Sequence, residues 1–190
     1  MKLCVFQGTV NPIHKAHLTM ADFVLKNYDF DKIFFIPAFK PPHKDYDENL
    51  TPHRLQMVKL ATQFNPKFEV LDIEYKNDRK SYTYLTILEL YKMFQIDGKI
   101  NFIIGTDAFE KIESWYEINN LKKLVKFLVF PRENLLDTTK FDALKLKGYD
   151  FEFMQMRFED ISSTQVRNGE IKNFVTKEVE EYIDKNGLYK

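Results

Sequence analysis

Two histidines near the start of the sequence are the residues whose types and spacing point most directly to chemistry. His14 and His17 are three residues apart and follow a turn that begins at Gly8, and in a helix this spacing puts both imidazoles on one face. The first amides of a helix attract phosphate, and imidazoles beside them can donate hydrogen bonds to phosphate oxygens. Gly8 would let a nucleotide approach the backbone closely. The segment indicates phosphate binding, while a turn followed by solvated histidines is the ordinary alternative.

Zinc binding is a third interpretation of the histidine pair, and the rest of the sequence argues against it. The chain has 4 histidines and 1 cysteine, Cys4, which lies in an apolar run. This ligand set is too poor for a tetrahedral zinc site, so we predict no metal-ligating residues. The 6 glycines are scattered and no Gly-Lys-Ser or Gly-Lys-Thr occurs, which excludes a Walker loop and a dinucleotide fingerprint. Phosphate binding would have to be of another type.

A second polar segment lies near the carboxyl end of the chain. Ser162, Ser163 and Thr164 open a predicted helix that carries Arg167 about one turn further on. Hydroxyl groups and amides cradle phosphate, and an arginine binds it with charge-assisted hydrogen bonds. Taken alone, the segment is typical of a Ser/Thr cap with a solvated arginine. Together with the histidine pair, phosphate binding is the favoured interpretation.

The elements that must position these segments are predicted by the hydrophobic pattern. Runs rich in β-branched and aromatic residues predict strands at residues 2–6, 32–36, 69–73, 101–104, 127–130 and 151–156. Helical patterns cover roughly residues 15–27, 52–63, 83–94 and 108–124. The alternation predicts an α/β fold with a doubly wound parallel sheet, helices on both faces and a small C-terminal helical part.

Local signals mark some of the boundaries of these elements. Thr51 followed by Pro52 predicts a cap with a proline in the first helical turn, and Asn186 with Gly187 predicts the end of the last helix. The pattern is weakest in residues 134–148, which we interpret as a loop with a short helix.

The bulk composition limits the class of protein. A chain of 190 residues with 44% hydrophobic residues suits one globular domain over residues 1–190. Lysine plus arginine equals aspartate plus glutamate at 28 each, so no overall positive field favours nucleic acid or an anionic membrane as a partner. No run has the length of a signal peptide or a transmembrane helix, which predicts a cytoplasmic protein. The sequence leaves the oligomeric state open, and a homo-oligomer is compatible with it.

The two polar segments together resemble a known signature. The pattern GxxxPxHxxH from Gly8 to His17, combined with ISSTxxR from residue 161 to Arg167, is similar to the signature pair of the nucleotidyltransferase superfamily that makes dinucleotide cofactors. The segments 41–44, 81–83, 103–107, 115–116 and 182–189 resemble the bacterial nicotinate-nucleotide adenylyltransferases, so the resemblance spans nearly the whole chain.

The sequence departs from this family's usual pattern at named positions. Gln7 and Val10 stand where the family commonly has glycine and phenylalanine, and Ala16 replaces a frequent glycine. The glycine that often follows the equivalent of Arg132 is absent. Both histidines and Arg167 are retained.

The resemblance implies a Rossmann-like fold and an enzyme of NAD biosynthesis. It would transfer the adenylyl group of ATP to nicotinate mononucleotide, giving deamido-NAD and pyrophosphate, with Mg²⁺ carried mainly by the ATP phosphates. The implied catalytic residues are His14, His17 and Arg167. ATP would also contact Gly8, Thr9, Gly105, Asp107, Ser163 and Thr164. The implied acceptor-binding residues are Lys44, Tyr82, Thr83, Trp115, Tyr116 and Arg132.

Discrimination of nicotinate from nicotinamide rests on one carboxylate. The predicted helix opening at Ser81, Tyr82 and Thr83 offers amides and a positive dipole end to receive that group. Trp115 and Tyr116 could stack on a pyridine ring, with anchoring of the helix to the core as the alternative.

Three other functions remain open at this point. A related enzyme could use nicotinamide mononucleotide or phosphopantetheine as the acceptor, or CTP as the donor. A regulatory module could keep the fold and bind a nucleotide without reaction. A nucleic-acid-binding domain has the least support, because no basic stripe emerges from the sequence.

Overall fold

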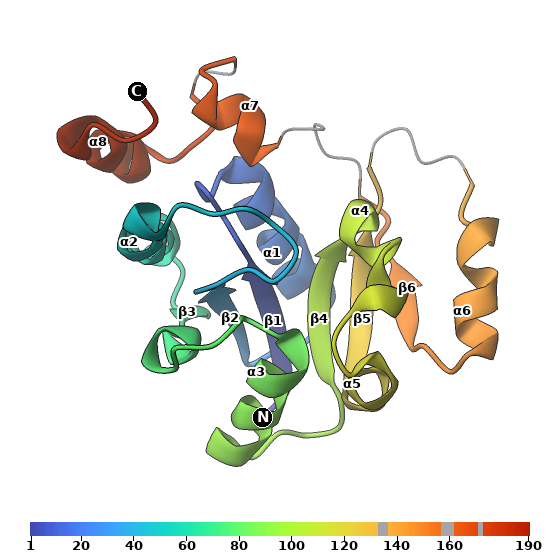
Figure 1. The fold of residues 1–190 in the computed structure, drawn as a ribbon. Coiled ribbons are helices and arrows are strands. Elements are labelled where there is room, and N and C mark those ends of the chain that lie inside the picture. Colours follow the sequence, from blue (N-terminus) through green and yellow to red (C-terminus); the bar gives the residue numbers. More distant parts are fainter. Residues whose placement is uncertain (133–136, 157–161, 171–172) are drawn as a thin grey trace.

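The computed structural model of the chain describes residues 1–132, 137–156, 162–170 and 173–190. Its centre is a six-stranded sheet in the order β3-β2-β1-β4-β5-β6 (Figure 1), and every neighbouring pair of strands is parallel. The order reverses between β1 and β4, so ligands are expected beyond the carboxyl ends of these two strands. The predicted doubly wound, Rossmann-like α/β fold is confirmed.

The strands and helices follow the chain in alternation. The strands are β1 (Leu3–Gly8), β2 (Lys32–Pro37), β3 (Phe68–Val70), β4 (Ile100–Gly105), β5 (Val125–Phe130) and β6 (Phe151–Phe153). The α-helices are α1 (Lys15–Asn27), α2 (Thr51–Thr62), α3 (Thr83–Met93), α4 (Thr106–Phe109), α5 (Ile118–Leu124), α6 (Asp142–Leu146), α7 (Ser163–Arg167) and α8 (Lys177–Asn186). Short 3-10 helices are η1 (Glu48–Leu50), η2 (Ile73–Lys76), η3 (Ile112–Ser114) and η4 (Thr139–Phe141).

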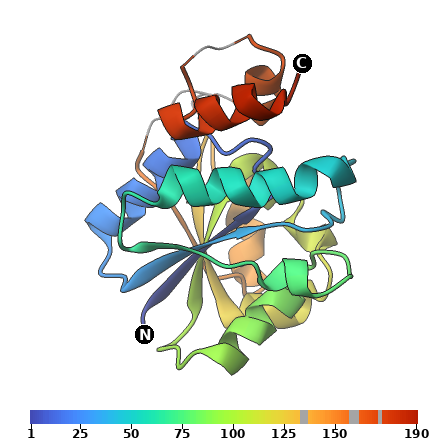
Figure 2. The ribbon, with the colours of Figure 1, turned by 90° about the vertical axis from the view of Figure 1, so that its left-hand side faces the viewer.

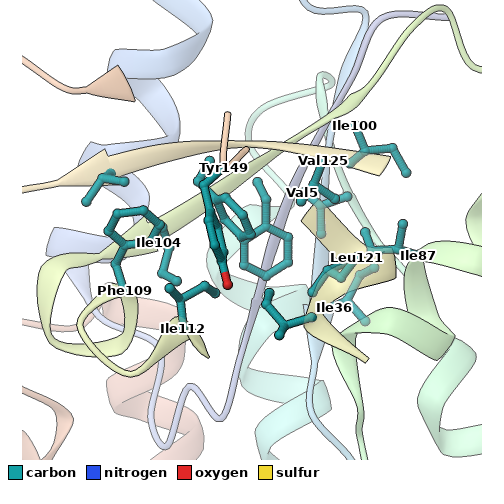
Figure 3. Close-up of a cluster of buried hydrophobic side chains, with 14 of the residues drawn as sticks. Val5, Ile36, Ile87, Ile100, Ile104, Phe109, Ile112, Leu121, Val125 and Tyr149 are labelled. Carbon is teal, nitrogen blue, oxygen red and sulfur yellow. The ribbon is translucent and has the colours of Figure 1, made fainter. Parts of the chain in front are cut away.

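Both faces of the sheet are covered, which explains why its central strands are apolar without alternation. On one face Cys4, Ile33 and Phe35 pack against side chains of α1, α2 and α8, and Figure 2 shows these helices along one side of the molecule with α8 above α2. On the other face Val5 and Ile104 pack against α3, η3 and α5 (Figure 3).

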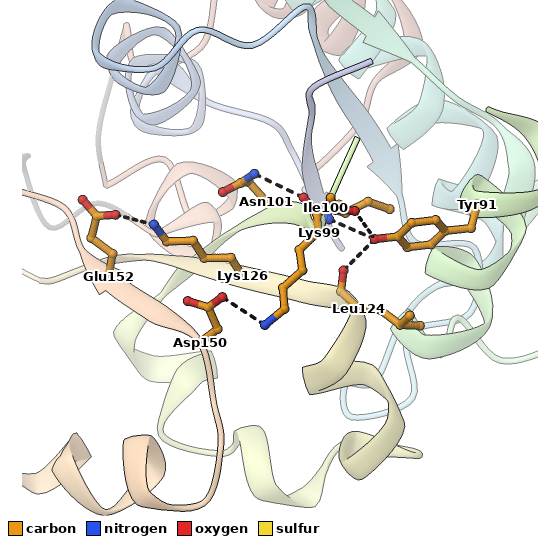
Figure 4. Close-up of polar contacts among 9 residues, drawn as sticks. Tyr91, Lys99, Ile100, Asn101, Leu124, Lys126, Asp150 and Glu152 are labelled. Atoms are coloured by element: carbon orange, nitrogen blue, oxygen red, sulfur yellow. Dashed lines mark hydrogen bonds and ion pairs between the residues drawn. The ribbon is translucent and has the colours of Figure 1, made fainter. Parts of the chain in front are cut away.

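Polar contacts hold the amino ends of the strands together (Figure 4). The Tyr91 hydroxyl accepts a hydrogen bond from the Ile100 amide at 3.2 Å and lies 2.9 Å from the Leu124 carbonyl, which it can donate to. Ion pairs join Lys99 to Asp150 at 3.0 Å and Lys126 to Glu152 at 2.8 Å. The side chains at this edge are therefore used to connect α3, β4, β5 and β6.

The predicted helix over residues 108–124 is wrong, because this stretch is divided into α4, η3 and α5. Trp115 has extended backbone angles and Glu117 has a φ of 53° in the left-handed region, so no single helix can pass through them. The break lets the Trp115 ring pack edge-on against Phe102 at 6.0 Å between ring centroids.

Three smaller predictions also need correction. The third strand ends at Val70 instead of residue 73, because Ile73 begins η2 and packs into the core. The sixth strand covers only Phe151–Phe153. Thr51 does not cap α2: it is the first helical residue after η1, and its hydroxyl accepts a hydrogen bond from Arg54 at 3.2 Å.

Two boundary predictions are confirmed. Gly187 ends α8 with a φ of 61°. The short helix expected within residues 134–148 corresponds to η4 and α6, while residues 134–136 lie outside the described residues. Within the described ranges, every helix is too short or too polar to cross a lipid bilayer.

Candidate active site

The histidine pair lies beyond the carboxyl end of β1. His14 is the amino-terminal cap of α1 and His17 is in its first turn. The two rings stack with 3.7 Å between their centroids and 24° between their planes. The His14 amide donates a hydrogen bond to His17 Nδ1 at 3.1 Å. Since Nδ1 accepts, the proton of a neutral His17 ring is on Nε2, which leaves an N–H available to a ligand.

Burial determines the protonation of the pair. It lowers the pKa of His14 from 6.5 to about 4. The pKa of His17 is also well below its usual value, through burial first and then through the charges of His14 and Lys44. Both rings are therefore neutral at pH 7 in the free protein. His14 Nδ1 is buried and has no hydrogen-bond partner among the described residues, so this site holds a polar atom that the surrounding protein leaves unsatisfied.

Two arginines that are distant in sequence hold the turn before the pair, one on each side of Val10. Arg54 Nη1 donates to the Thr9 carbonyl at 3.0 Å and Arg167 Nη1 to the Asn11 carbonyl at 2.6 Å. Val10, between them, has a φ of 41°, which is rare for a β-branched residue and marks strain at this turn. The arginines thus fix the path of a backbone that its own residue types do not favour.

The predicted serine-rich segment is next to this turn. Ser162 caps α7 and exchanges hydrogen bonds with Gln165, so the cap interpretation is correct for Ser162. Ser163 Oγ donates to the Pro12 carbonyl at 3.0 Å, and Arg167 Nη2 donates to Thr164 Oγ1 at 3.1 Å. The two segments that the sequence singled out are therefore brought together. Residue 161 of the motif lies outside the described residues.

The two glycines at the strand ends have free space beside them. A Cβ atom added to Gly105 would meet no atom within 4 Å, and one added to Gly8 would meet only Val10 Cγ1 at 3.8 Å. Neither glycine has a positive φ. Packing and backbone geometry within the protein therefore do not require glycine here, whereas close approach of a ligand would.

Asp107 and Arg132 meet at the carboxyl ends of β4 and β5. Arg132 Nη2 lies 2.5 Å from Asp107 Oδ2, and the Arg132 amide donates to Thr106 Oγ1 at 3.3 Å. The family resemblance implies contact of Asp107 with ATP and of Arg132 with the acceptor. Their ion pair places both residues in one part of the site.

The predicted acceptor side is aromatic. Tyr82 caps α3, and its ring stacks on Tyr116 with 4.4 Å between centroids and 26° between planes. Tyr116 is 45% exposed, whereas Trp115 packs into the core. Of the two aromatic residues expected to stack on a pyridine ring, Tyr116 is thus the accessible one, and Trp115 fits the anchoring alternative.

The helix opening on this side offers fewer amides than the sequence indicated. The Ser81 amide donates to the Lys40 carbonyl at 2.9 Å, and Ser81 Oγ accepts from the Lys40 amide at 3.0 Å. Thr83 begins α3, and the first amides of a helix have no partner within it. The amides that remain for a carboxylate are therefore those of Thr83 and Tyr84.

Lys44 lies in the loop between β2 and η1 and is exposed. Its charge contributes to the low pKa of His17, so its cation is within electrostatic range of the histidine pair.

Sequence reasoning missed two buried charged residues that shape the site. Arg54 is 1% exposed and donates to three carbonyl oxygens, of Thr9, Ala38 and Phe39. Glu74 accepts hydrogen bonds from the Phe39 amide at 3.2 Å and the Thr86 hydroxyl at 2.7 Å. Each lies in a stretch whose pattern is that of a solvated helix face or loop, and no local signal distinguishes it.

The sheet order, together with a histidine-bearing turn held by an arginine-bearing helix, defines the class of the protein as a nucleotidyltransferase. Residues 5–169 match the cytidylyltransferase-like family. The chain is 37% identical to the "Probable nicotinate-nucleotide adenylyltransferase" of Caldicellulosiruptor saccharolyticus, covering 100% of both chains. It is 34% identical to the nicotinate-nucleotide adenylyltransferase of Bacillus subtilis, covering 99% of this chain and 98% of that one. The chain therefore belongs to the nicotinate-nucleotide adenylyltransferases, within the cytidylyltransferase-like family.

A solved structure confirms the fold. The chain aligns with Plasmodium falciparum nicotinic acid mononucleotide adenylyltransferase complexed with NaAD, with a TM-score of 0.75, 21% identity and coverage of 98% of this chain and 96% of that one. At this identity the likeness concerns the fold.

Proposed function

We propose that the chain transfers the adenylyl group of ATP to nicotinate mononucleotide, forming deamido-NAD and pyrophosphate in NAD biosynthesis. The observation that carries this proposal is the stacked pair of buried His14 and half-buried His17, next to a turn that Arg167 holds, in a chain whose full-length relatives carry that enzyme name. The P. falciparum structure in complex with NaAD gives further support, because it has this fold.

The reaction breaks one bond and forms one. A phosphate oxygen of the acceptor attacks the α-phosphorus of ATP, and the bond from that phosphorus to the β-phosphate bridging oxygen breaks, so pyrophosphate leaves. No covalent enzyme intermediate is needed. The protein contributes positioning and stabilisation of developing negative charge. His17 Nε2–H is the donor for that charge, since Nδ1 is used by the His14 amide.

Arg167 and the Thr164 hydroxyl would hold the triphosphate, because the single O–H of Ser163 is already donated to the Pro12 carbonyl. Arg167 already uses N–H groups on the Asn11 carbonyl and on Thr164, but a guanidinium has five donors, so others are left for phosphate. A bound polyanion would also raise the pKa of the neutral histidines, so ATP binding would take up protons.

The acceptor would lie on the side of Tyr82 and Tyr116. Its pyridine ring would stack on Tyr116, and its carboxylate would accept hydrogen bonds from the Thr83 and Tyr84 amides at the positive end of α3. No acidic residue lies in the first turn of this helix. The neutral carboxamide of nicotinamide mononucleotide could not form these bonds with the strength of a charged carboxylate. The site therefore favours nicotinate over nicotinamide.

Mg²⁺ would enter the site on the triphosphate. Among the described residues, no group of three or more histidine, cysteine, aspartate or glutamate side chains could hold a metal ion. A cation coordinated mainly by phosphate oxygens and water fits this donor set. It would neutralise part of the charge that the two substrates bring together.

The test is pyrophosphate release by the purified protein with ATP and Mg²⁺. Nicotinate mononucleotide, nicotinamide mononucleotide and phosphopantetheine are compared as acceptors, and strong preference for the first is expected. Equal efficiency with nicotinamide mononucleotide would contradict the role of the Thr83 and Tyr84 amides. Absence of pyrophosphate release with every acceptor, in protein that still binds ATP, would favour a regulatory module.

A further inference from the structure

The segment that follows α8 returns to the phosphate side of the site. The Tyr189 hydroxyl donates a hydrogen bond to Asn11 Oδ1. The backbone carbonyl of the same Asn11 accepts from Arg167 at 2.6 Å. Asn11 is therefore held twice, through its side chain by Tyr189 and through its backbone by a residue expected to bind phosphate. It lies three positions before His14.

Tyr189 is itself held firmly in place. Gly187 ends α8 in the left-handed conformation, and the Leu188 amide donates back to the Ile183 carbonyl at 3.0 Å, which closes the helix end as in a Schellman motif. Leu188 is 9% exposed and packs into the core cluster under α1, α2 and α8. The packed end of α8 thus positions the Tyr189 ring beside the turn that contains Asn11.

The surroundings of the Tyr189 hydroxyl keep it protonated, so that it can donate a hydrogen bond. Burial raises the pKa of Tyr189, and the nearby cations Arg167 and Arg54 oppose that shift without cancelling it. The hydroxyl remains protonated at neutral pH and can donate to the Asn11 side chain. These two cations are the residues that hold the Asn11 and Thr9 carbonyls, so Tyr189 belongs to the group of side chains that fixes the turn.

We propose that Tyr189 is a positioning residue for adenylyl transfer, which fixes Asn11 and with it the turn that presents His14 and His17 to the ATP phosphates. The proposal rests on the proposed function. It concerns the donor nucleotide only, because Tyr189 packs on the face of the sheet covered by α1, α2 and α8, whereas Tyr84 and Trp115, the neighbours of the acceptor-side tyrosines, pack on the other face.

The test removes only the hydroxyl group, with Tyr189→Phe. Its matched control is Tyr182→Phe, which removes another hydroxyl from the same region, bonded to His53 of α2 at 2.8 Å and not to the turn. We expect Tyr189→Phe to lower kcat/KM for ATP about tenfold, as loss of one partly buried hydrogen bond allows. The KM for nicotinate mononucleotide should stay unchanged, and the control should keep wild-type kinetics.

Two further measurements separate positioning from a structural effect. If Tyr189 acts through Asn11, Asn11→Ala should lose a similar factor, and the double variant should lose no more than either single one. Independent, additive losses would overturn the proposal. So would equal kinetics of Tyr189→Phe and the control.

Binding measured without turnover keeps this test separate from the proposed function. Calorimetry with a non-hydrolysable ATP analogue should show weaker binding to Tyr189→Phe than to Tyr182→Phe. If the wild type bound the analogue but released no pyrophosphate with any acceptor, the proposed function would fail. The difference in analogue affinity between Tyr189→Phe and Tyr182→Phe would still decide the role of Tyr189. Equal affinities would overturn that role.

Discussion

The two sides of the site are built in different ways. On the phosphate side, the turn from Gly8 to His14 is held by hydrogen bonds to backbone carbonyls from Arg54, Ser163 and Arg167. On the acceptor side, Tyr82 and Tyr116 lie stacked on each other. A site for a polyanion must have its donors in place beforehand, because reorganising charged groups during the reaction is costly. A ring that binds a flat apolar surface can exchange one stacking partner for another.

The pre-formed phosphate side is tested most directly by a substitution at His17. We expect His17→Ala to lower kcat about a hundredfold or more, since loss of one donor aimed at transition-state charge typically has that effect. The free energy of unfolding should change far less, because the ring is only partly covered. Pyrophosphate release and urea unfolding measure the two quantities. Unchanged turnover would remove His17 from the mechanism.

The pre-formed character of the phosphate side has a signature in the pH dependence of stability. His14 has a pKa of about 4 when folded, against an ordinary value of 6.5. Below pH 6.5 the unfolded chain therefore binds a proton that the folded chain does not. The stability contributed by neutral His14 is complete above pH 6.5 and is lost as the pH falls toward 4. Between pH 6.5 and 5 the loss is about 2 kcal/mol.

Urea unfolding of His14→Gln across this pH range checks that prediction. The curve of stability against pH should be flatter than that of the wild type by about 2 kcal/mol. His43→Gln, which changes an exposed histidine, is the matched control and should follow the wild type. Parallel curves for all three proteins would show that His14 is not held neutral.

The adaptable character of the acceptor side is tested at Tyr116. We expect Tyr116→Ala to raise the KM for nicotinate mononucleotide about tenfold, the scale of one aromatic contact, with little change for ATP. Trp115→Phe is the companion variant, because it keeps an aromatic ring against Phe102 in the core. A larger rise in this KM for Trp115→Phe than for Tyr116→Ala would reverse the assignment of the two rings.

The smallest effect is expected at Gly105. A methyl group there meets no protein atom within 4 Å and the φ of −82° suits alanine, so Gly105→Ala should fold at least as stably as the wild type. If the nucleotide occupies the space beside Gly105, the added methyl group should raise the KM for ATP about threefold to fivefold. This corresponds to a fraction of the free energy that overpacking a protein core typically costs. Steady-state kinetics with ATP varied measures this, and an unchanged KM would place the nucleotide elsewhere.

The elements and the phosphate side were predictable because their signals are local. Continuous apolar runs mark strands buried on both faces, and a glycine turn with two histidines or a hydroxyl-rich helix start can be recognised within a few residues. The sequence paired the two segments only through their resemblance to one signature, because β6, the strand before the serine-rich segment, lies three strands from β1 in the sheet.

The remaining features depend on contacts that no short window contains. Arg54 has the sequence context of a solvated helix residue, and only the three-dimensional arrangement turns it toward the Thr9 and Ala38 carbonyls. The division of residues 106–124 arises because Trp115 packs against Phe102 of β4. In both cases tertiary packing overrides local propensity.

The hydrogen bonds around Asn11 and Pro12 have a consequence for how the molecule folds. They join residues that are 151, 156 and 178 positions apart in the sequence. Contacts of such high sequence separation form late, because the entropy of closing a long loop must be overcome first. The parallel sheet can therefore assemble before the nucleotide site exists. In the native state, local opening of α7 and α8 would dismantle the phosphate side while leaving the sheet intact.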